Sequence, residues 1–156
     1  MSPNEIYSLI EFLSFRTISS ESSSEIHQCA NWLKKYFLSL GLYSEVWETK
    51  NNPTVFSYTS HIEGAPTILI YGHYDVQAVE NLGTWQYDPF KPQIKNNQIF
   101  ARGAADNKGQ IFYSFLAIKE LIDKNELNLN VKFIIDGGEE IGSPGIKNII
   151  SSKKKN

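Results

Sequence analysis

Three short apolar segments are each followed at once by a polar cluster, and this arrangement restricts the fold more than any other feature of the sequence. The segments cover residues 67–71, 99–101 and 131–135, and a helical pattern of apolar residues at 107–122 lies between the last two. The order strand, helix, strand predicts a βαβ unit whose helix packs on a sheet. We therefore expect a single α/β sandwich domain.

The segment 67–71 reads Thr-Ile-Leu-Ile-Tyr and is apolar throughout instead of alternating. Such a run is typical of a central strand that is covered on both faces. Segments rich in β-branched and aromatic residues predict two further strands near 43–49 and 54–60. A turn-rich stretch with several prolines occupies residues 81–97.

Two helices are predicted ahead of the strands. Each begins with a Ser that is followed three residues later by a Glu, which is the pattern of a reciprocal N-cap: Ser2 with Glu5, and Ser22 with Glu25. Apolar residues then recur at helical spacing in both segments. Gly41 is a typical C-terminal stop for the second helix.

The charge balance excludes two classes of partner. The chain has 15 Lys and Arg and 17 Asp and Glu, with a formal net charge of -2, and both signs are spread along it. No field of one sign is available to attract nucleic acid or an anionic membrane. The three lysines at 153–155 form a short run that indicates a solvated chain end. We expect neither nucleic acid nor a membrane as a partner.

The start of the chain does not resemble a secretory signal, and no apolar stretch approaches the roughly 20 residues that cross a bilayer. We therefore expect a cytoplasmic protein. Cys29 is the single cysteine, which excludes an internal disulfide and any cysteine-rich zinc motif. A metal site in this chain would have to use His and carboxylate side chains.

Polar residues directly after the predicted strands form the candidate site, because ligands of α/β sheets bind beyond the carboxyl ends of the strands. We expect the clusters at 72–75, 102–106 and 136–140 to meet at one edge of the sheet. His73 and Asp75 are two residues apart, so in extended backbone both point to the same side. The carboxylate could then fix the ring nitrogen that does not bind metal. An isolated His, in contrast, is usually only hydrogen-bonded in a turn.

Asp106 has two interpretations. It lies just ahead of the predicted helix, where it could serve only as the N-cap. Gly103 and Gly109 bracket it, however, and indicate a tight backbone course that brings one carboxylate to a fixed point. A ligand that bridges two cations requires such a placement.

Glu139 and Glu140 follow a predicted strand and a Gly-Gly pair, where they could form no more than a solvated acidic turn. The functional interpretation gives them different tasks. In two-metal hydrolysis one carboxylate binds metal, while another takes a proton from the attacking water and passes it to the leaving amine.

Four sequence blocks resemble, in order and approximate spacing, family twenty of the metallopeptidases. They are YGHYDVQ, Trp85 followed by Asp88-Pro89-Phe90, ARGAADNKGQ, and GGEEIGSPG. That family includes carnosine and nonspecific dipeptidases, aminoacylases, glutamate-releasing carboxypeptidases and succinyl-diaminopimelate desuccinylase. The forms RGAADNKG and EEIGSPG are most similar to its dipeptidase branch.

The resemblance implies a three-layer sandwich of the zinc-dependent exopeptidase type, with a mixed, mostly parallel sheet. It implies that His73 binds one zinc ion, that Glu140 binds a second and that Asp106 bridges both. Asp75 would support the site, and Glu139 would be the general base for the attacking water. Cobalt or manganese would also suit these oxygen and nitrogen ligands. The resemblance further implies a cis peptide bond after Asp106.

The implied reaction is hydrolysis of the amide bond of dipeptides or N-acyl amino acids. Members of the family have a further carboxylate ligand, a final His ligand and a smaller domain through which many form dimers, and the sequence shows none of these. We therefore expect residues 1–156 to be the amino-terminal part of a catalytic zinc-peptidase domain that is inactive alone. Two alternatives are a non-catalytic remnant that folds partly and binds metal weakly, and a metal-free α/β interaction module.

Overall fold

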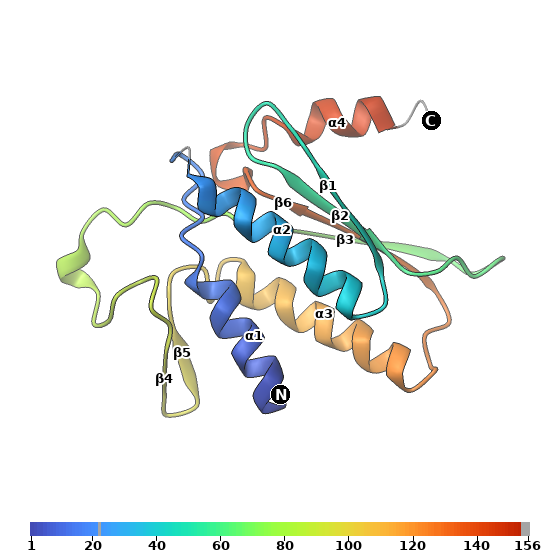
Figure 1. The fold of residues 1–156 in the computed structure, drawn as a ribbon, viewed down its shortest axis with the longest axis horizontal. Helices are drawn as coiled ribbons and strands as arrows, with labels where there is room; N and C mark the ends of the chain where they lie inside the picture. The colour runs from blue at the N-terminus through green and yellow to red at the C-terminus, as the bar shows by residue number, and fades with distance from the viewer. Residues whose placement is uncertain (22, 154–156) are drawn as a thin grey trace.

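The computed structural model describes residues 1–21 and 23–153 and consists of a four-stranded sheet with helices on both faces (Figure 1). A separate hairpin of two short strands lies beside it. The elements are α1 (Pro3–Ser14), α2 (Ser24–Ser39), β1 (Tyr43–Trp47), β2 (Thr54–Tyr58), β3 (Thr67–His73), the 3-10 turn η1 (Leu82–Thr84), β4 (Gln93–Lys95), β5 (Gln98–Phe100), α3 (Lys108–Asp123), β6 (Asn130–Asp136), the 3-10 turn η2 (Glu139–Ile141) and α4 (Ile146–Lys153).

The strand order in the main sheet is β1-β2-β6-β3. β3 and β6 are parallel, whereas β1 pairs with β2, and β2 with β6, in antiparallel fashion. The predicted α/β fold with a mixed sheet is confirmed. The expected predominance of parallel pairs does not extend to the described strands, because a short connection joins β1 to β2 and such connections produce antiparallel neighbours.

β3 forms an edge of the main sheet, so the prediction that residues 67–71 form a central strand covered on both faces is wrong. Leu69 is 59% exposed and Tyr71 is 50% exposed. An apolar run records which side chains a strand carries, but the neighbours of the strand come from segments far away in the sequence. β3 pairs on one side with β6, and among the described residues no strand pairs with its other side.

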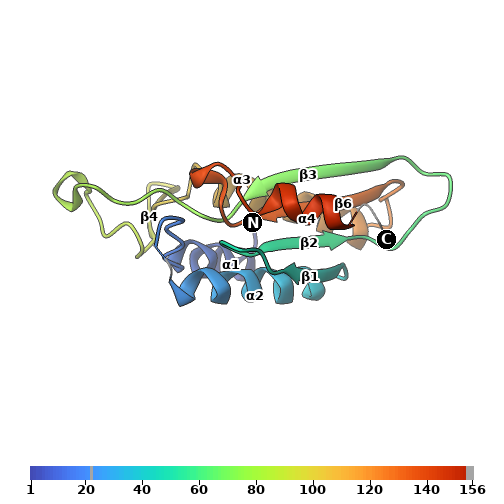
Figure 2. The same ribbon diagram turned by 90° about the horizontal axis from the view of Figure 1, so that it is seen from above.

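Helices α1, α2 and α3 cover one face of the sheet and α4 lies on the other, which gives the three layers seen in Figure 1. Figure 2 looks onto the sheet, with α4 lying across the strands. Phe133 of β6 faces the three helices, and its ring centroid lies 5.1 Å from that of Phe37 and 5.4 Å from that of Phe115. The next residue, Ile134, points the opposite way and packs with Trp47 and α4. Burial on both faces thus makes β6 the central strand that anchors the acidic residues after it.

Both predicted N-terminal helices are present. The reciprocal N-cap of α1 is confirmed, because Glu5 N–H donates to Ser2 Oγ (3.3 Å) and Ser2 N–H donates to Glu5 Oε2 (2.6 Å). The predicted cap of the second helix at Ser22 lies outside the described residues. The N-cap of α2 is Ser23, whose hydroxyl accepts the N–H of Glu25 (3.1 Å).

The strand predicted at 99–101 corresponds to β5, which belongs to the small β4–β5 hairpin. The cluster at 102–106 therefore does not extend from the edge of the main sheet, and this part of the prediction is wrong. Of the lysine run predicted to form a solvated end, only residue 153 lies within the described part of the chain. Residues 151–153 continue α4, and residues 154–156 lie outside the described part of the chain.

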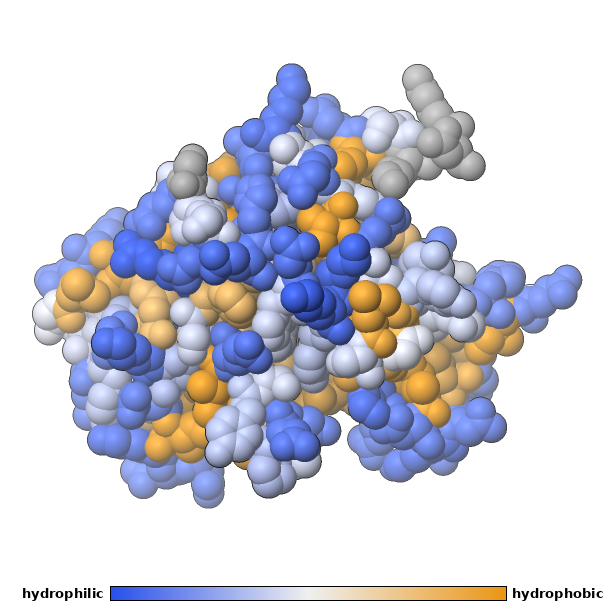
Figure 3. All heavy atoms as spheres, viewed as in Figure 1, coloured by the Kyte–Doolittle hydropathy of each residue, from blue (hydrophilic) through white to orange (hydrophobic). Residues whose placement is uncertain are grey.

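No helix in the described ranges combines the length and apolar character needed to cross a membrane. On the face drawn in Figure 3, hydrophobic atoms form separate patches among hydrophilic ones.

The carboxyl end of β3 packs tightly against α3. Gly72 allows this approach, because a Cβ at that position would lie 2.2 Å from Ile111 Cγ2 and 2.7 Å from Asn107 Oδ1. Both neighbours belong to the region where α3 begins. The distance between His73 and the loop ahead of α3 therefore depends on a residue without a side chain.

We predict that Gly72→Ala lowers the free energy of unfolding by about 1–3 kcal/mol, which is the usual effect of overpacking a dense interior. Urea denaturation followed by circular dichroism measures the change. Gly138→Ala is the matched control, because its Cβ would have no neighbour nearer than 3.7 Å. Equal stability of the two variants would contradict the proposed tight contact.

Candidate metal centre

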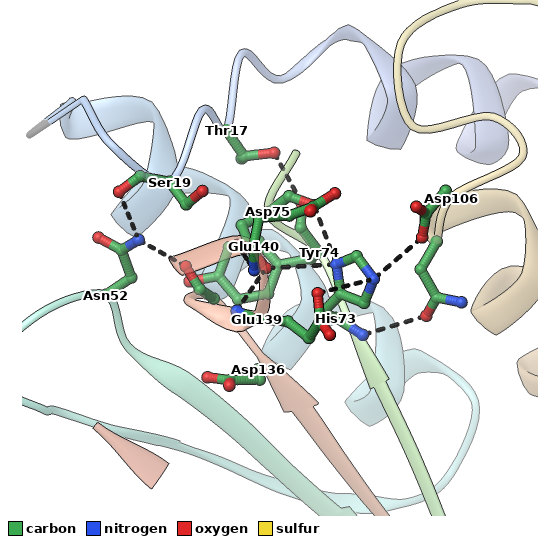
Figure 4. Close-up of polar contacts among 12 residues, drawn as sticks. Thr17, Ser19, Asn52, His73, Tyr74, Asp75, Asp106, Asp136, Glu139 and Glu140 are labelled. Carbon is green, nitrogen blue, oxygen red and sulfur yellow. Dashed lines mark hydrogen bonds and ion pairs between the residues drawn. The ribbon is translucent and has the colours of Figure 1, made fainter. Parts of the chain in front are cut away.

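His73 is the last residue of β3, and its imidazole ring is held from both sides (Figure 4). Its Nδ1 lies 3.1 Å from the carbonyl oxygen of Asp75 and 3.3 Å from Asp75 Oδ1. Its Nε2 faces the opposite way, 3.1 Å from Asp106 Oδ1 and 3.8 Å from Glu139 Oε2. The contact between His73 and Asp75 that the spacing predicted is therefore present.

Asp75 is completely buried and connects His73 to the segment after β6. Its Oδ1 accepts the backbone N–H of Glu139 (3.2 Å), and its Oδ2 accepts the backbone N–H of Glu140 (3.0 Å). We call residues Gly137–Glu140 the acidic turn. A single carboxylate thus sets the separation between the imidazole ring and both glutamates of this turn.

Asp106 comes from the loop that precedes α3. The N-cap of α3 is Asn107, so the interpretation of Asp106 as a simple N-cap is wrong. The N–H of Gly109 donates to Gly103 O (3.3 Å), which closes the tight loop that the two glycines predicted. The peptide bond between Asp106 and Asn107 is cis, as the family resemblance implied. The side chain of Asp106 is 72% exposed and points toward the His73 ring.

The end of β3, the loop before α3 and the acidic turn bring one imidazole and two carboxylates together. The potential ligand atoms of His73, Asp106 and Glu140 all lie within 4.8 Å of one another. We call these residues the His–Asp–Glu cluster. Gln77 Nε2 donates to Glu140 Oε2 (2.9 Å), which holds the second carboxylate in place. Glu139 lies beside the cluster, and its side chain is 42% exposed.

The two residues that follow Asp106 anchor the loop, and no separate pattern in the sequence indicated either of them. The Asn107 side chain accepts the backbone N–H of His73 on its Oδ1 (3.1 Å), so it ties the loop to the end of β3. Lys108 is fully buried, and its Nζ donates to Phe12 O (3.1 Å) and Phe15 O (2.8 Å) at the end of α1. Both residues lie within the block ARGAADNKGQ, where the motif itself was the available signal.

A third missed residue lies far from the motifs. Asn52, in the connection between β1 and β2, contacts the acidic turn. Asn52 lies between the strands predicted near 43–49 and 54–60 and had no predicted role, because a side-chain contact across 85 positions leaves no local pattern.

The electrostatic environment favours a positive charge at His73. Burial by itself lowers the pKa of the imidazole, but the hydrogen bonds and negative charge of Asp75, with the charge of Glu139, more than offset it and raise the pKa from 6.5 to about 9. The same carboxylates attract any cation that approaches the ring. A metal ion would have to displace the proton on Nε2, so metal binding to this His is expected to strengthen as the pH rises.

We predict that Asp75→Asn lowers the pKa of His73 from its wild-type value of about 9, because burial remains while the carboxylate that does most to raise the pKa is removed. NMR titration of the imidazole in metal-free protein measures this. Since the folded pKa exceeds the unfolded value, His73 stabilises the metal-free fold below pH 6.5, and this contribution is lost as the pH rises through about 9. Unchanged titration in the variant would refute the role given to Asp75.

Curated relatives with peptidase names match this chain. It is 34% identical to the probable di- and tripeptidase DUG2 of Saccharomyces cerevisiae, over 90% of this chain and 18% of the yeast protein. It is 30% identical to the beta-Ala-His dipeptidase of Rattus norvegicus, over 67% of this chain and 21% of the rat protein. The chain thus spans about a fifth of the length of each of these relatives.

Solved structures share the fold. An M20 family metallo-carboxypeptidase of Sulfolobus solfataricus, Sso-CP2, superposes with a TM-score of 0.92 and is 41% identical, over 99% of this chain and 35% of that one. Human carnosine dipeptidase 1 gives a TM-score of 0.88 over 98% of this chain and 36% of that one. At 22% identity, this second match shows likeness of fold alone.

The sequence model of one peptidase family matches the part of the chain that carries the site. The match covers residues 69–156, a range that includes the His–Asp–Glu cluster, Asp75 and Glu139. The predicted membership of a metallopeptidase family is confirmed, since this range is more than half of the 156 residues. The chain belongs to peptidase family M20/M25/M40.

Proposed function

We propose that this chain contributes a divalent-metal centre for the hydrolysis of the amide bond in dipeptides or N-acyl amino acids. The observation that carries the proposal is the His–Asp–Glu cluster, whose potential ligand atoms lie within 4.8 Å of one another. One imidazole nitrogen and two carboxylates form a donor set that suits zinc, and also cobalt or manganese. The residues present therefore fit the metal that membership of a metallopeptidase family implies.

We propose that the site holds two ions that share Asp106. His73 with Asp106 would hold one zinc ion, and Asp106 with Glu140 would hold the second. Each ion would then have two protein ligands from this cluster, whereas catalytic zinc normally has three protein ligands and a water. We therefore propose that full activity needs ligands beyond the cluster, and that these 156 residues alone bind metal without efficient turnover.

The remaining residues have distinct tasks in this proposal. Divalent metal, when bound, lowers the pKa of water toward neutrality and polarises the scissile carbonyl. Glu139 would accept the proton of the attacking water and return it to the leaving amine, because its carboxylate is exposed beside the cluster. Asp75 would keep Nδ1 of His73 protonated, so that Nε2 offers its lone pair to the metal.

Short peptides are the substrate class that the relatives favour. The yeast relative is described as a probable di- and tripeptidase, the rat relative as a beta-Ala-His dipeptidase and the Sulfolobus solfataricus protein as a metallo-carboxypeptidase. All three descriptions imply cleavage of a peptide bond near a chain end. The substrate of this chain is proposed by analogy with them.

We predict that Glu140→Gln reduces the amount of zinc retained after equilibrium dialysis, because it removes a negatively charged ligand, and that Glu139→Gln retains the wild-type amount. Metal analysis of the dialysed proteins measures both. The pair is well matched, since the two residues are adjacent and the backbone N–H of each donates to Asp75.

Three outcomes would contradict the assignment. A wild-type chain that retains no zinc would remove the proposed metal centre. Equal zinc content in Glu140→Gln and wild type would show that Glu140 is not a ligand. Loss of zinc in Glu139→Gln would show that the roles of the two glutamates are exchanged or shared.

A further inference from the structure

Asn52 joins three segments that are far apart in the sequence (Figure 4). Its Nδ2 donates to Gly137 O (2.5 Å) at the start of the acidic turn and to Ser19 O (3.2 Å) in the connection between α1 and α2. Ser19 N–H in turn donates to Val76 O (3.2 Å), immediately after Asp75. The Asn52 amide therefore links the acidic turn to the α1–α2 connection, and that connection is itself hydrogen-bonded to the residue after Asp75.

The chemistry of these contacts requires a carboxamide. Both partners of Asn52 are carbonyl oxygens, so both hydrogens of its NH₂ group are used as donors. An aspartate has the same shape but would place acceptor against acceptor, and a leucine of similar size has no donor. The side chain at this position thus sets the place of the Gly137 carbonyl through two specific hydrogen bonds.

Gly137 has little freedom to move once its carbonyl is held. A Cβ on Gly137 would lie 2.4 Å from Tyr74 Oη and 2.6 Å from Pro53 O. Tyr74 is fully buried, and its hydroxyl donates to Pro53 O (2.8 Å). Pro53 follows Asn52 directly, so both residues of this connection contact the same region around Gly137. The first residue of the acidic turn is therefore packed against a buried ring and hydrogen-bonded to the β1–β2 connection.

The acidic turn is thus fixed at both ends. Asn52 holds the carbonyl of Gly137, and Asp75 holds the backbone N–H groups of Glu139 and Glu140. Without the Asn52 contact, the turn would keep its bonds to Asp75 and the Gln77 contact to the Glu140 carboxylate. Its Gly137 end could then shift, which would move Glu140 relative to His73 and Asp106. Such outer contacts orient metal ligands in other proteins, and their removal typically weakens metal binding.

We propose that Asn52 is a positioning residue for the metal centre, which it serves by fixing the acidic turn that carries Glu139 and Glu140. The inference rests on the proposed function, because it assigns Asn52 a part in holding Glu140 as a ligand. Asn52 itself makes no contact with the ion and acts through Gly137.

The test is the zinc affinity of Asn52→Leu, measured by calorimetric titration of metal-free protein. We expect about 10-fold weaker binding than in wild type, within the usual range for an outer contact of a metal ligand. The matched control is Asn130→Leu. Asn130 also donates from Nδ2 to two backbone carbonyls, those of Ile62 (3.0 Å) and Ala65 (3.1 Å), but it lies at the opposite end of β6.

A second measurement separates positioning from general loss of stability. In a Glu140→Gln background, Asn52→Leu should produce no further loss of zinc affinity, because its effect is transmitted through that ligand. Urea denaturation without metal should show that Asn130→Leu is destabilised at least as much as Asn52→Leu. If Asn52→Leu does not fold, Asn52→Ser, which keeps one donor, should bind zinc with an affinity between those of wild type and Glu140→Gln.

The possible results are distinct. Wild-type affinity in the Asn52 variant, equal weakening in Asn130→Leu, or an undiminished effect in the Glu140→Gln background would each overturn the inference while the metal centre stands. If wild-type protein binds no zinc, the proposed function fails and the positioning role fails with it.

Discussion

A carboxylate without contact with solvent holds the two halves of the site together. Isolated carboxylates are very unfavourable inside proteins, so a buried one has to be surrounded by donors. Asp75 obtains these donors from His73 on one side and from the two backbone N–H groups of the acidic turn on the other. The close approach of β3 and the segment after β6 therefore satisfies one buried charge, and the geometry of the His–Asp–Glu cluster follows from it.

A buried cation performs the corresponding task for the loop that carries Asp106. Burial lowers the pKa of Lys108 to about 8, and its ammonium group donates to two carbonyls at the end of α1, where the helix dipole favours positive charge. The start of α3 is thereby fixed against α1. Asp106 and Asn107 come immediately before Lys108, so the contacts of Lys108 also fix their position. One buried anion and one buried cation thus locate ligands from separate parts of the chain.

Local patterns in the sequence predicted the helices and strands better than they predicted which strands pair with one another. The capping pattern of Ser2 and Glu5, the helix after Asn107 and the strand that precedes Asp136 were recovered, since each depends on residues close together in the chain. The edge position of β3 was not, because an apolar run does not specify which strands lie beside it. The segment 99–101 was likewise predicted as the first strand of a βαβ unit, whereas β5 pairs with β4 in a separate hairpin.

The same difference between local and distant contacts decides which residues of the candidate site could be predicted. His73, Asp75, Asp106, Glu139 and Glu140 could be recognised because they follow strands or precede a helix within distinctive blocks. The motifs also predicted the pairing of His73 with Asp75. Asn52 could not be found, since its partners Ser19 and Gly137 are 33 and 85 positions away and a carboxamide in a turn is ordinary. A residue inside a motif can be recognised from its neighbours in the sequence, whereas a residue whose partners are far away in the sequence cannot.

The parallel pairing of β3 with β6 has a consequence for folding. Parallel neighbours require a crossover, and here the crossover contains the hairpin, the loop with Asp106 and the whole of α3. Asp75 and the N–H group of Glu140 are 65 positions apart, so no local fragment brings the cluster together, and loop closure has to precede it. An ion bound there would favour the completed sheet over partly folded forms, because only the completed sheet brings the three residues of the His–Asp–Glu cluster together. Binding of an ion to the cluster would therefore report that the crossover between β3 and β6 has formed.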